Sequence, residues 1–194
     1  MESVPEARPV AVYDANVLYP AHLRDLLMRL AVGDLVRAHW SEQIHEEWMR
    51  NVCADYADVT WEDLEYTRSE MDRALPDARV EGHEELAEGL SLPDPGDRHV
   101  LAAAIYVQAD YLVTFNLRDF PQARLDPRGI EAIHPDEFIG LLMDRAPDRV
   151  LEVASRHRAA LRKPPMEAGE YLDALRRGGL EKTAGRLEGR REEL

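Results

Sequence analysis

Four polar side chains stand beside apolar segments in the first 120 residues of the chain: Asp14, Asp97, Asn116 and Asp119. Carboxylates that lie close together repel one another, and a hard divalent cation relieves this repulsion. Ligand sets made only of oxygen favour Mg²⁺ or Mn²⁺ over zinc. Such an ion can hold a phosphodiester, activate a water molecule and stabilise the charge on the leaving oxygen. If these side chains converge, the sequence therefore predicts metal-assisted chemistry on a phosphate ester.

A fifth candidate, Glu47, lies on a segment with helical periodicity. Ile44, Trp48 and Val52 recur every four residues and define one apolar face. At about 100° per residue, Glu47 lies roughly 100° from the centre of this face and Glu46 roughly 160°. Glu47 therefore flanks the buried face and can reach a site at its edge, whereas we expect Glu46 to point to solvent.

Apolar runs alternate with helical patterns in this part of the chain, and this alternation predicts the fold. Strands alternating with helices favour an α/β fold, here a three-layer sandwich with a mostly parallel central sheet. In such sheets, ligands collect at the carboxyl ends of the strands, where Asp14 and Asn116 are expected. We expect strands at 11–13, 36–40, 111–115 and 130–133, and helices around 23–33, 41–52, 61–75, 84–90, 97–107 and 136–143.

Pro147 marks the expected boundary between a domain over residues 1–146 and a helical extension over residues 147–194. The apolar residues of the extension predict two helices, around 150–161 and 171–175. These apolar residues are too few to form an independent core. We therefore expect the extension to dock on the domain or on a partner.

The formal net charge of −14 excludes a generic polyanion binder. The charge is uneven, because residues 1–150 carry 14 basic and 30 acidic residues whereas residues 151–194 carry 10 and 8. The single cysteine, Cys53, rules out an internal disulfide and a cysteine-pair zinc site. No apolar stretch approaches the roughly 20 residues of a membrane-spanning helix, and no signal peptide is expected at the start of the sequence. We expect a cytoplasmic setting.

Motifs of other enzyme classes are incomplete. The segment from His45 begins like the helix of a zinc protease, but Met49 stands where the second histidine is needed. The sequence contains no phosphate-binding Walker A loop, no dinucleotide-binding glycine pattern and no nucleophile elbow. These absences leave the carboxylates as the strongest candidates for chemistry.

Four short motifs resemble, in order and spacing, those of PIN-domain ribonucleases. Residues 14–18 (Asp-Ala-Asn-Val-Leu), which follow a predicted strand, resemble the first motif, and Ser41 followed by Glu47 resembles the second. Residues 94–104 (Asp-Pro-Gly-Asp-Arg-His-Val-Leu-Ala-Ala-Ala) resemble the third, and residues 113–121 (Val-Thr-Phe-Asn-Leu-Arg-Asp-Phe-Pro) resemble the fourth. Each motif is short, but four in order are fairly specific.

This resemblance covers about residues 8–143 and implies an α/β sandwich that hydrolyses RNA with Mg²⁺ or Mn²⁺. Many members of the family are VapC-type toxins, each neutralised by a cognate antitoxin, and such domains commonly pair as homodimers. A subset of toxin-like members carries a helical C-terminal extension. The catalytic and metal-binding residues that the resemblance implies are Asp14, Glu47 and Asp97, with Asn116 or Asp119 completing the site.

The fourth position departs from the family pattern, because many members have an aspartate where this chain has Asn116. An amide oxygen can coordinate a hard cation, but it brings no negative charge. If the turn after the strand curls into a helical start, Asp119 falls on the same side as Asn116. We therefore expect Asp119 to be the charged fourth acid and Asn116 to orient water or the scissile phosphate. The alternative is that Asp119 only caps the turn.

Two other functions compete with this interpretation. A haloacid-dehalogenase-like phosphatase also begins with a strand and an aspartate, but Asn16 replaces its second acid and residues 1–150 contain no lysine. A non-catalytic interaction module would keep the PIN fold and act through protein contacts, although the retained acids argue against it. The ten basic residues of the tail, among them Arg162 and Lys163, suggest guidance of RNA, and a purely packing role is the alternative.

Overall fold

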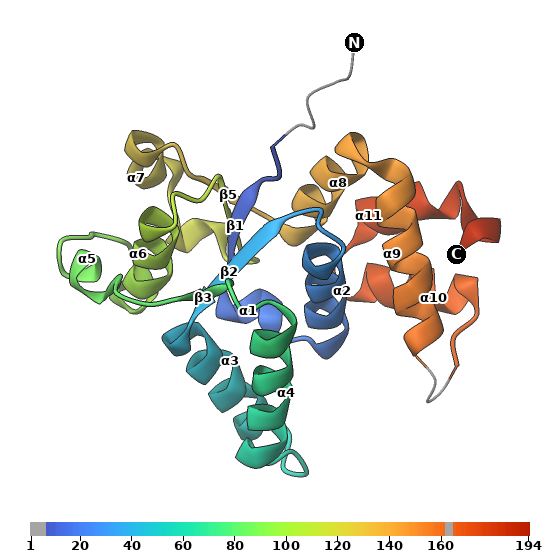
Figure 1. Cartoon of the computed structure of the whole chain (residues 1–194), viewed down its shortest axis with the longest axis horizontal. Helices are drawn as coiled ribbons and strands as arrows, with labels where there is room; N and C mark the ends of the chain where they lie inside the picture. Colours follow the sequence, from blue (N-terminus) through green and yellow to red (C-terminus); the bar gives the residue numbers. More distant parts are fainter. Residues whose placement is uncertain (1–6, 162–164) are drawn as a thin grey trace.

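Five short parallel strands form the central sheet of the computed structural model, which describes residues 7–161 and 165–194 (Figure 1). Across the sheet the order is β3-β2-β1-β4-β5. Val12 of the central strand pairs with His39 on one side and with Leu112 on the other. The predicted α/β fold with a parallel sheet is confirmed. The strands are β1 (Val10–Tyr13), β2 (Arg37–Ser41), β3 (Arg79–Val80), β4 (Tyr111–Val113) and β5 (Glu131–Ile133).

Helices cover both faces of this sheet and give the domain three layers (Figure 1). On one face α6 packs against β1, β2 and β4, and the small buried side chains of Ala102, Ala103 and Ala104 allow this close approach. On the other face Phe138 of α8 meets the ring of Tyr13 edge-on. The helices are α1 (Ala15–Leu18), α2 (Ala21–Val32), α3 (Glu42–Asp55), α4 (Trp61–Ala74), α5 (Glu84–Glu88), α6 (Arg98–Tyr106), α7 (Gln122–Leu125) and α8 (Pro135–Arg145).

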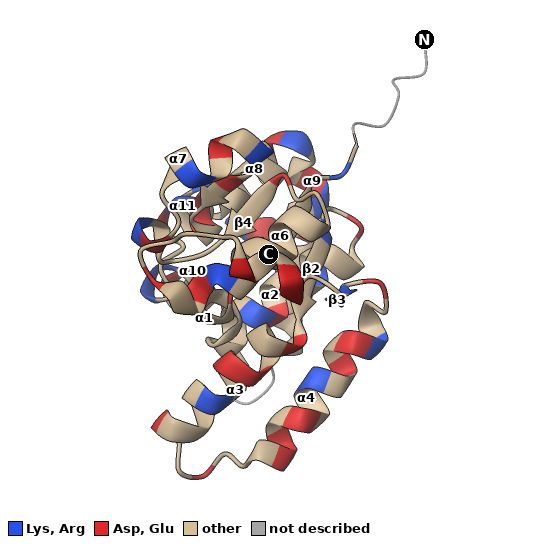
Figure 2. Ribbon diagram, turned by 90° about the vertical axis from the view of Figure 1, so that its left-hand side faces the viewer, with Lys and Arg blue, Asp and Glu red and all other residues tan. Residues whose placement is uncertain are grey.

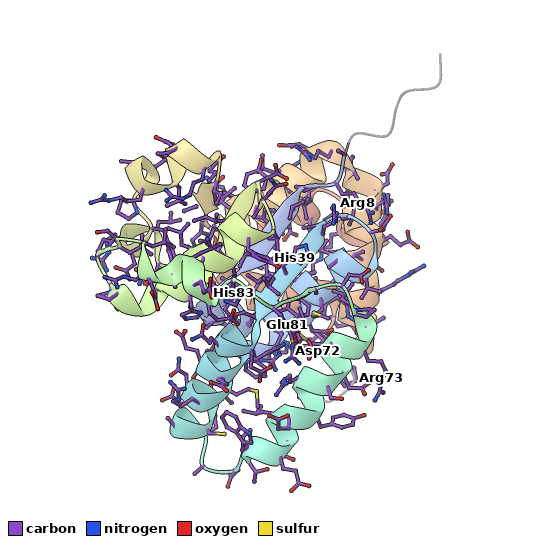
Figure 3. The ribbon with its side chains drawn as sticks, turned by 60° about the vertical axis from the view of Figure 1, so that its left-hand side comes forward. Arg8, His39, Asp72, Arg73, Glu81 and His83 are labelled. Atoms are coloured by element: carbon purple, nitrogen blue, oxygen red, sulfur yellow. The ribbon has the colours of Figure 1, made fainter. Side chains whose placement is uncertain are left out.

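Helices α3 and α4 extend away from the rest of the domain, and α4 carries mostly acidic residues with a few arginines among them (Figure 2). Asp72 of α4, labelled in Figure 3, ties this pair to the sheet. Its carboxylate accepts a hydrogen bond from Trp40 Nε1 at 3.0 Å and lies 3.3 Å from His45 Nε2. Burial lowers the pKa of His45 to about 4, so its ring is neutral. Trp48 donates to His45 Nδ1, which leaves the ring proton on Nε2, facing Asp72.

The described part of the C-terminal extension, residues 147–161 and 165–194, contains three α-helices and docks on the domain. α9 packs against α2 and α8, and α11 packs against α8. We expected the extension to dock on the domain or on a partner, and these contacts show that it docks on the domain. The predicted division at residues 146 and 147 falls between α8 and α9, but its status as a domain boundary stays a prediction. The helices are α9 (Pro147–Ala160), α10 (Ala168–Arg177) and α11 (Glu181–Glu188).

Ion pairs engage many of the basic residues of the extension. Arg190 pairs with Asp148 and Glu193, Arg186 pairs with Asp144, and Lys182 pairs with Glu137. Arg156, Arg176 and Arg191 also have acidic partners. This arrangement favours the packing role of these side chains over guidance of RNA. Arg162 and Lys163 lie outside the described residues, as does the segment 1–6 in which no signal peptide is expected.

Several details differ from the sequence predictions, which also missed the four-residue helices α1 and α7. β3 was not predicted, because two residues in a polar context carry no periodicity. α11 was also not predicted, because only Thr183, Ala184 and Leu187 of its eight residues are buried. The third strand ends at Val113 rather than at Phe115, since the chain turns there to form the site described below. In the described part of the chain, no helix is long and apolar enough to cross a membrane.

Candidate active site

Asp14 stands at the carboxyl end of the central strand and begins α1. Its side chain is buried, with 3% of its surface exposed. The Oδ1 atom accepts the backbone N–H of Ala15 at 2.7 Å, which caps the short helix. The Oδ2 atom accepts hydrogen bonds from Asn16 Nδ2 and from Thr114 Oγ1, each at 2.7 Å. Because a carboxylate offers about four lone-pair sites, these three bonds leave room for one further ligand.

The strands β1 and β4 bring this constellation together, although Asp14 and Thr114 are 100 residues apart in the sequence. Thr114 directly follows β4 and its hydroxyl also accepts the backbone N–H of Asn116 at 2.9 Å. The side chain of Asn16 bridges the same two strands, because its Oδ1 accepts the backbone N–H of Phe115 at 3.0 Å. The site therefore lies at the carboxyl edge of the sheet, where the order of the strands reverses and ligands of α/β proteins collect.

Glu47 approaches this edge from α3. Its Oε2 atom lies 3.3 Å from Nε2 of His99, which sits in the first turn of α6. The charge of Glu47 also raises the pKa of Asp14, which shows that the two carboxylates are close enough to interact. Glu46 is exposed and has no such influence. The position of Glu47 beside the buried face thus agrees with the helical geometry inferred from the sequence.

Asp97 lies at the amino end of α6 and completes the cluster. Burial raises its pKa to about 7, and the charges of Asp14, Asp94, Asp119 and Glu47 add to that rise. Burial is likewise the main reason that the pKa of Asp14 is raised to about 6, while the hydrogen bond from Thr114 opposes the rise. Five carboxylates from four segments of the chain therefore share one electrostatic environment.

Asn116 and Asp119 face each other in the turn after β4. Residues Leu117–Asp119 form a single turn of 3-10 helix, as required for the two side chains to lie on one side. The amide of Asn116 donates a hydrogen bond to the carboxylate of Asp119. This contact holds Asp119 in place, and the negative charge of Asp119 reaches Asp97. In this arrangement Asn116 acts on Asp119, whereas the sequence prediction gave it a role toward water or the phosphate.

The carboxylates lie near one another, but they do not form a complete metal-coordination site. Among residues 7–161 and 165–194, no group of three or more histidine, cysteine, aspartate or glutamate side chains has the arrangement needed to hold a metal ion. Unshielded carboxylates repel one another, and this repulsion opposes closer packing of these side chains. The chemistry of the cluster, which offers only oxygen donors from its acids, suits Mg²⁺ or Mn²⁺.

The structure adds residues that the sequence prediction did not assign. Asn16 and Thr114 hold Asp14 in place, and Asp94 contributes negative charge while it caps the turn before α6. His99 lies within the third sequence motif, but its contact with Glu47 was not predicted. Asn16 lies within the first sequence motif, so its spacing from Asp14 was the available signal. Thr114 could be found only from the pairing of β1 with β4.

The raised pKa of Asp97 predicts how the metal-free protein responds to pH. Between about pH 4 and pH 7 the folded protein holds a proton that the unfolded chain has lost, so the stability of the wild type falls as the pH rises through this range. Asp97→Asn removes this penalty. We expect its melting temperature in chelator to exceed that of the wild type at about pH 8, with the gap closing toward about pH 4.

Glu46→Gln provides the matched control, because this exposed acid of α3 lies outside the cluster. Its melting temperature relative to the wild type should not depend on pH. If Asp97→Asn and the wild type show the same pH dependence of melting, Asp97 does not experience the crowding described above.

Comparisons with known protein families agree with this architecture. The PIN domain family matches residues 10–118, more than half of the chain, and the VapC50 C-terminal domain family matches residues 135–189. A protein of Mycobacterium tuberculosis (strain ATCC 25618 / H37Rv), named "Putative ribonuclease VapC50", is 40% identical over 79 residues. This alignment covers 41% of the chain and 47% of that relative, so the chain spans about half the length of the relative that it matches.

No solved structure matches the chain. The family assignment therefore depends on the sequence matches, and the parallel sheet with its carboxyl-edge acids is consistent with it. The chain belongs to the PIN domain family, and its C-terminal helices match the VapC50 C-terminal domain.

Proposed function

We propose that the protein is a metal-dependent endoribonuclease that acts in the cytoplasm as the toxin of a toxin–antitoxin pair. The observation that carries this proposal is the gathering of five carboxylates at the carboxyl edge of the sheet, where burial raises the pKa of Asp97 to about 7 and the charges of the other four acids add to the rise. A crowded set of acids at this position has a direct use when a divalent cation binds among them.

Mg²⁺ or Mn²⁺ is the cofactor that fits these residues. Asp14, Glu47, Asp97 and Asp119 would supply negatively charged oxygen ligands, and Asp14 retains a free lone-pair site after its three hydrogen bonds. When bound, the ion would supply an activated water molecule and stabilise the charge on the leaving oxygen of a phosphodiester. It would also give an acidic surface the local positive charge needed to attract RNA.

The residues of the chain provide position and orientation. Asn16 and Thr114 fix the carboxylate of Asp14, and Asn116 fixes that of Asp119. His99 lies against Glu47 and restricts where that carboxylate can point. Arg98, next to Asp97 in the sequence, is a candidate for contact with the phosphate backbone.

The alternatives have less support. The family match gives no basis for a haloacid-dehalogenase-like phosphatase. A non-catalytic interaction module remains the competing function, and it predicts that the acids can be replaced without loss of activity in the cell.

Replacement of the acids tests catalysis. Asp14→Asn, Glu47→Gln and Asp97→Asn are each expected to lower metal-dependent RNA cleavage by more than about 100-fold, because the loss of a direct ligand should exceed the roughly 10- to 100-fold cost typical of residues that only support ligands. The measurement is the rate of cleavage of a mixed single-stranded RNA pool with Mn²⁺ or Mg²⁺ and with chelator.

Glu46→Gln should cleave RNA like the wild type, since its side chain is exposed. Wild-type rates in two of the three acid variants would refute the proposed ligand set. A dead Glu46→Gln together with an active Glu47→Gln would show that the wrong glutamate of α3 was chosen.

The variant Asp119→Asn distinguishes a role of Asp119 as a metal ligand from a role as the cap of a turn. If Asp119 is the charged fourth acid, the metal concentration needed for half-maximal rate should rise about 10-fold or more, with little change in melting temperature. A capping role would instead lower the melting temperature and leave the metal requirement unchanged. Metal titrations of the cleavage rate, combined with thermal melts in chelator, distinguish the two.

The proposed partner is a small antitoxin that places a helix or an extended segment over the acidic edge, with a basic residue among the carboxylates. Residues 1–150 carry 14 basic and 30 acidic residues, and their field favours a cationic ligand. A second copy of the chain is a further proposed partner. Co-expression with the neighbouring open reading frame should relieve growth arrest and yield a copurifying protein. If no neighbour copurifies, the toxin assignment fails while the nuclease assignment survives.

A further inference from the structure

Phe115 links the candidate site to the C-terminal extension. Its backbone N–H donates to Asn16 Oδ1 at 3.0 Å. Because this bond occupies the oxygen of the Asn16 amide, the nitrogen of that amide faces the other way, toward Asp14 and Thr114. The backbone position of Phe115 therefore determines which way Asn16 points, and Asn16 in turn holds the carboxylate of Asp14.

The ring of Phe115 packs against two segments outside the site. It meets the ring of His134, which follows β5, at 5.1 Å between centroids and at an angle of 73°. It also lies against the turn between α10 and α11, where a β-carbon added at Gly179 would stand 3.4 Å from its Cε1 atom. Gly179 has φ +84°, a conformation that glycine adopts without strain. The chain can therefore pass close to Phe115 at this point.

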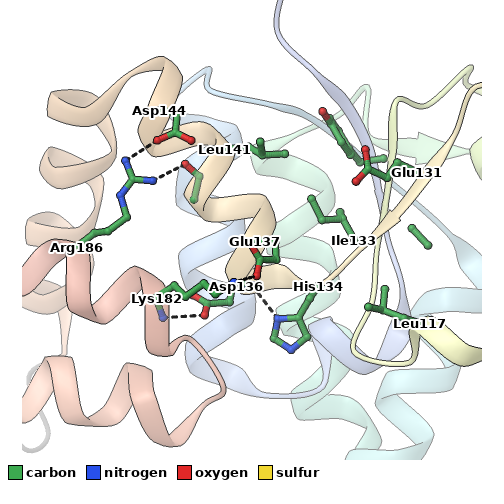
Figure 4. Close-up of a pocket in the computed structure, with 13 residues that line it drawn as sticks. Leu117, Glu131, Ile133, His134, Asp136, Glu137, Leu141, Asp144, Lys182 and Arg186 are labelled. Carbon is green, nitrogen blue, oxygen red and sulfur yellow. Dashed lines mark hydrogen bonds and ion pairs between the residues drawn. The ribbon is translucent and has the colours of Figure 1, made fainter.

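Asp136 fixes both of these segments. Its carboxylate is buried and accepts the backbone N–H groups of Lys182 and Thr183 at 2.8 Å each, so it caps the amino end of α11. Its own backbone N–H donates to Nδ1 of His134 at 3.1 Å. Figure 4 shows Asp136 between His134 and Lys182, on the wall of a cavity of about 450 Å³ between β5, α8 and α11. None of the five candidate site residues lines this cavity.

We propose that the C-terminal extension is a positioning element for the active site. Through Asp136, the domain locks the Gly179 turn and His134 against Phe115, and Phe115 orients Asn16, which holds Asp14. The extension thus contributes no metal ligand of its own, but it determines the orientation of the Asp14 carboxylate. The consequence for catalysis rests on the proposed function. The mechanical link, by which we mean the chain of contacts from the Gly179 turn through Phe115 to Asn16, does not.

Hydrogen exchange tests the mechanical link without metal or RNA. Gly179→Leu extends a side chain from a β-carbon that would already lie in van der Waals contact with Phe115, at 3.4 Å from Cε1, and so crowds the ring. Gly129→Leu is the matched control, because Gly129 also has a positive φ (+68°) but nothing within 4 Å of an added β-carbon. In Gly179→Leu we expect the amide of Phe115 to exchange about tenfold faster than in the wild type, the change expected for the loss of one hydrogen bond. Gly129→Leu should leave that rate unchanged. Equal protection of Phe115 in both variants and the wild type would overturn the inference.

A second pair of variants tests the consequence for the site. Phe115→Leu removes the aromatic contact, and Asp144→Asn is its control, because Asp144 joins α8 to α11 through Arg186 without touching Phe115. Phe115→Leu should weaken Mn²⁺ binding, measured directly by calorimetry, by about 10-fold or more and lower kcat, with KM for RNA within about twofold of wild type. Asp144→Asn should bind Mn²⁺ like the wild type.

Unchanged Mn²⁺ affinity in Phe115→Leu, with only its melting temperature lowered, would reduce the extension to a packing role and overturn the inference. If the wild-type protein cleaves no RNA, the proposed function fails, but the exchange rate of the Phe115 amide still decides whether the extension positions the site.

Discussion

The pairing of β1 with β4 is the constraint on which the site depends. It places Thr114 within 2.7 Å of Asp14 across 100 residues of sequence and lets Asn16 bridge the two strand ends. The other acids are then brought to the same edge by the helices that leave or enter neighbouring strands. Glu47 comes from the helix after β2, and Asp97 stands at the start of the helix that leads into β4. Without this register, the first and fourth motifs would have no common site.

Carboxylates that lie close together destabilise a folded protein by their mutual repulsion. Hydrogen bonds to some of these carboxylates offset the repulsion. Asp14 is stabilised by three hydrogen bonds, and Asp119 is held by Asn116. Asp97 has no comparable support, because its burial and the charges of the neighbouring acids all raise its pKa. Under the proposed function, a divalent cation would supply the compensation that Asp97 lacks.

Much of this arrangement could be predicted from the sequence, and the reasons for success and failure are physical. Asp14 follows a buried apolar run, and Ser41, which begins the second motif, caps α3 by accepting the N–H of Ile44. The side of α3 on which Glu47 lies followed from the periodicity of its apolar residues. The assignments that failed concern short or non-local features. β3 has two residues, α11 is stabilised by its contacts with α8, and the role of Thr114 depends on a strand partner far away in the sequence.

The most direct test of the account is a calorimetric titration of Mn²⁺ into the metal-free protein at about pH 7.5, comparing the wild type with Asp97→Asn and Glu46→Gln. If the acids at the carboxyl edge of the sheet form a divalent-metal site, the wild type and Glu46→Gln should bind the ion with the same affinity. Asp97→Asn should bind it about 10-fold more weakly or worse. Failure of the wild type to bind, or equal binding by all three proteins, would contradict the account.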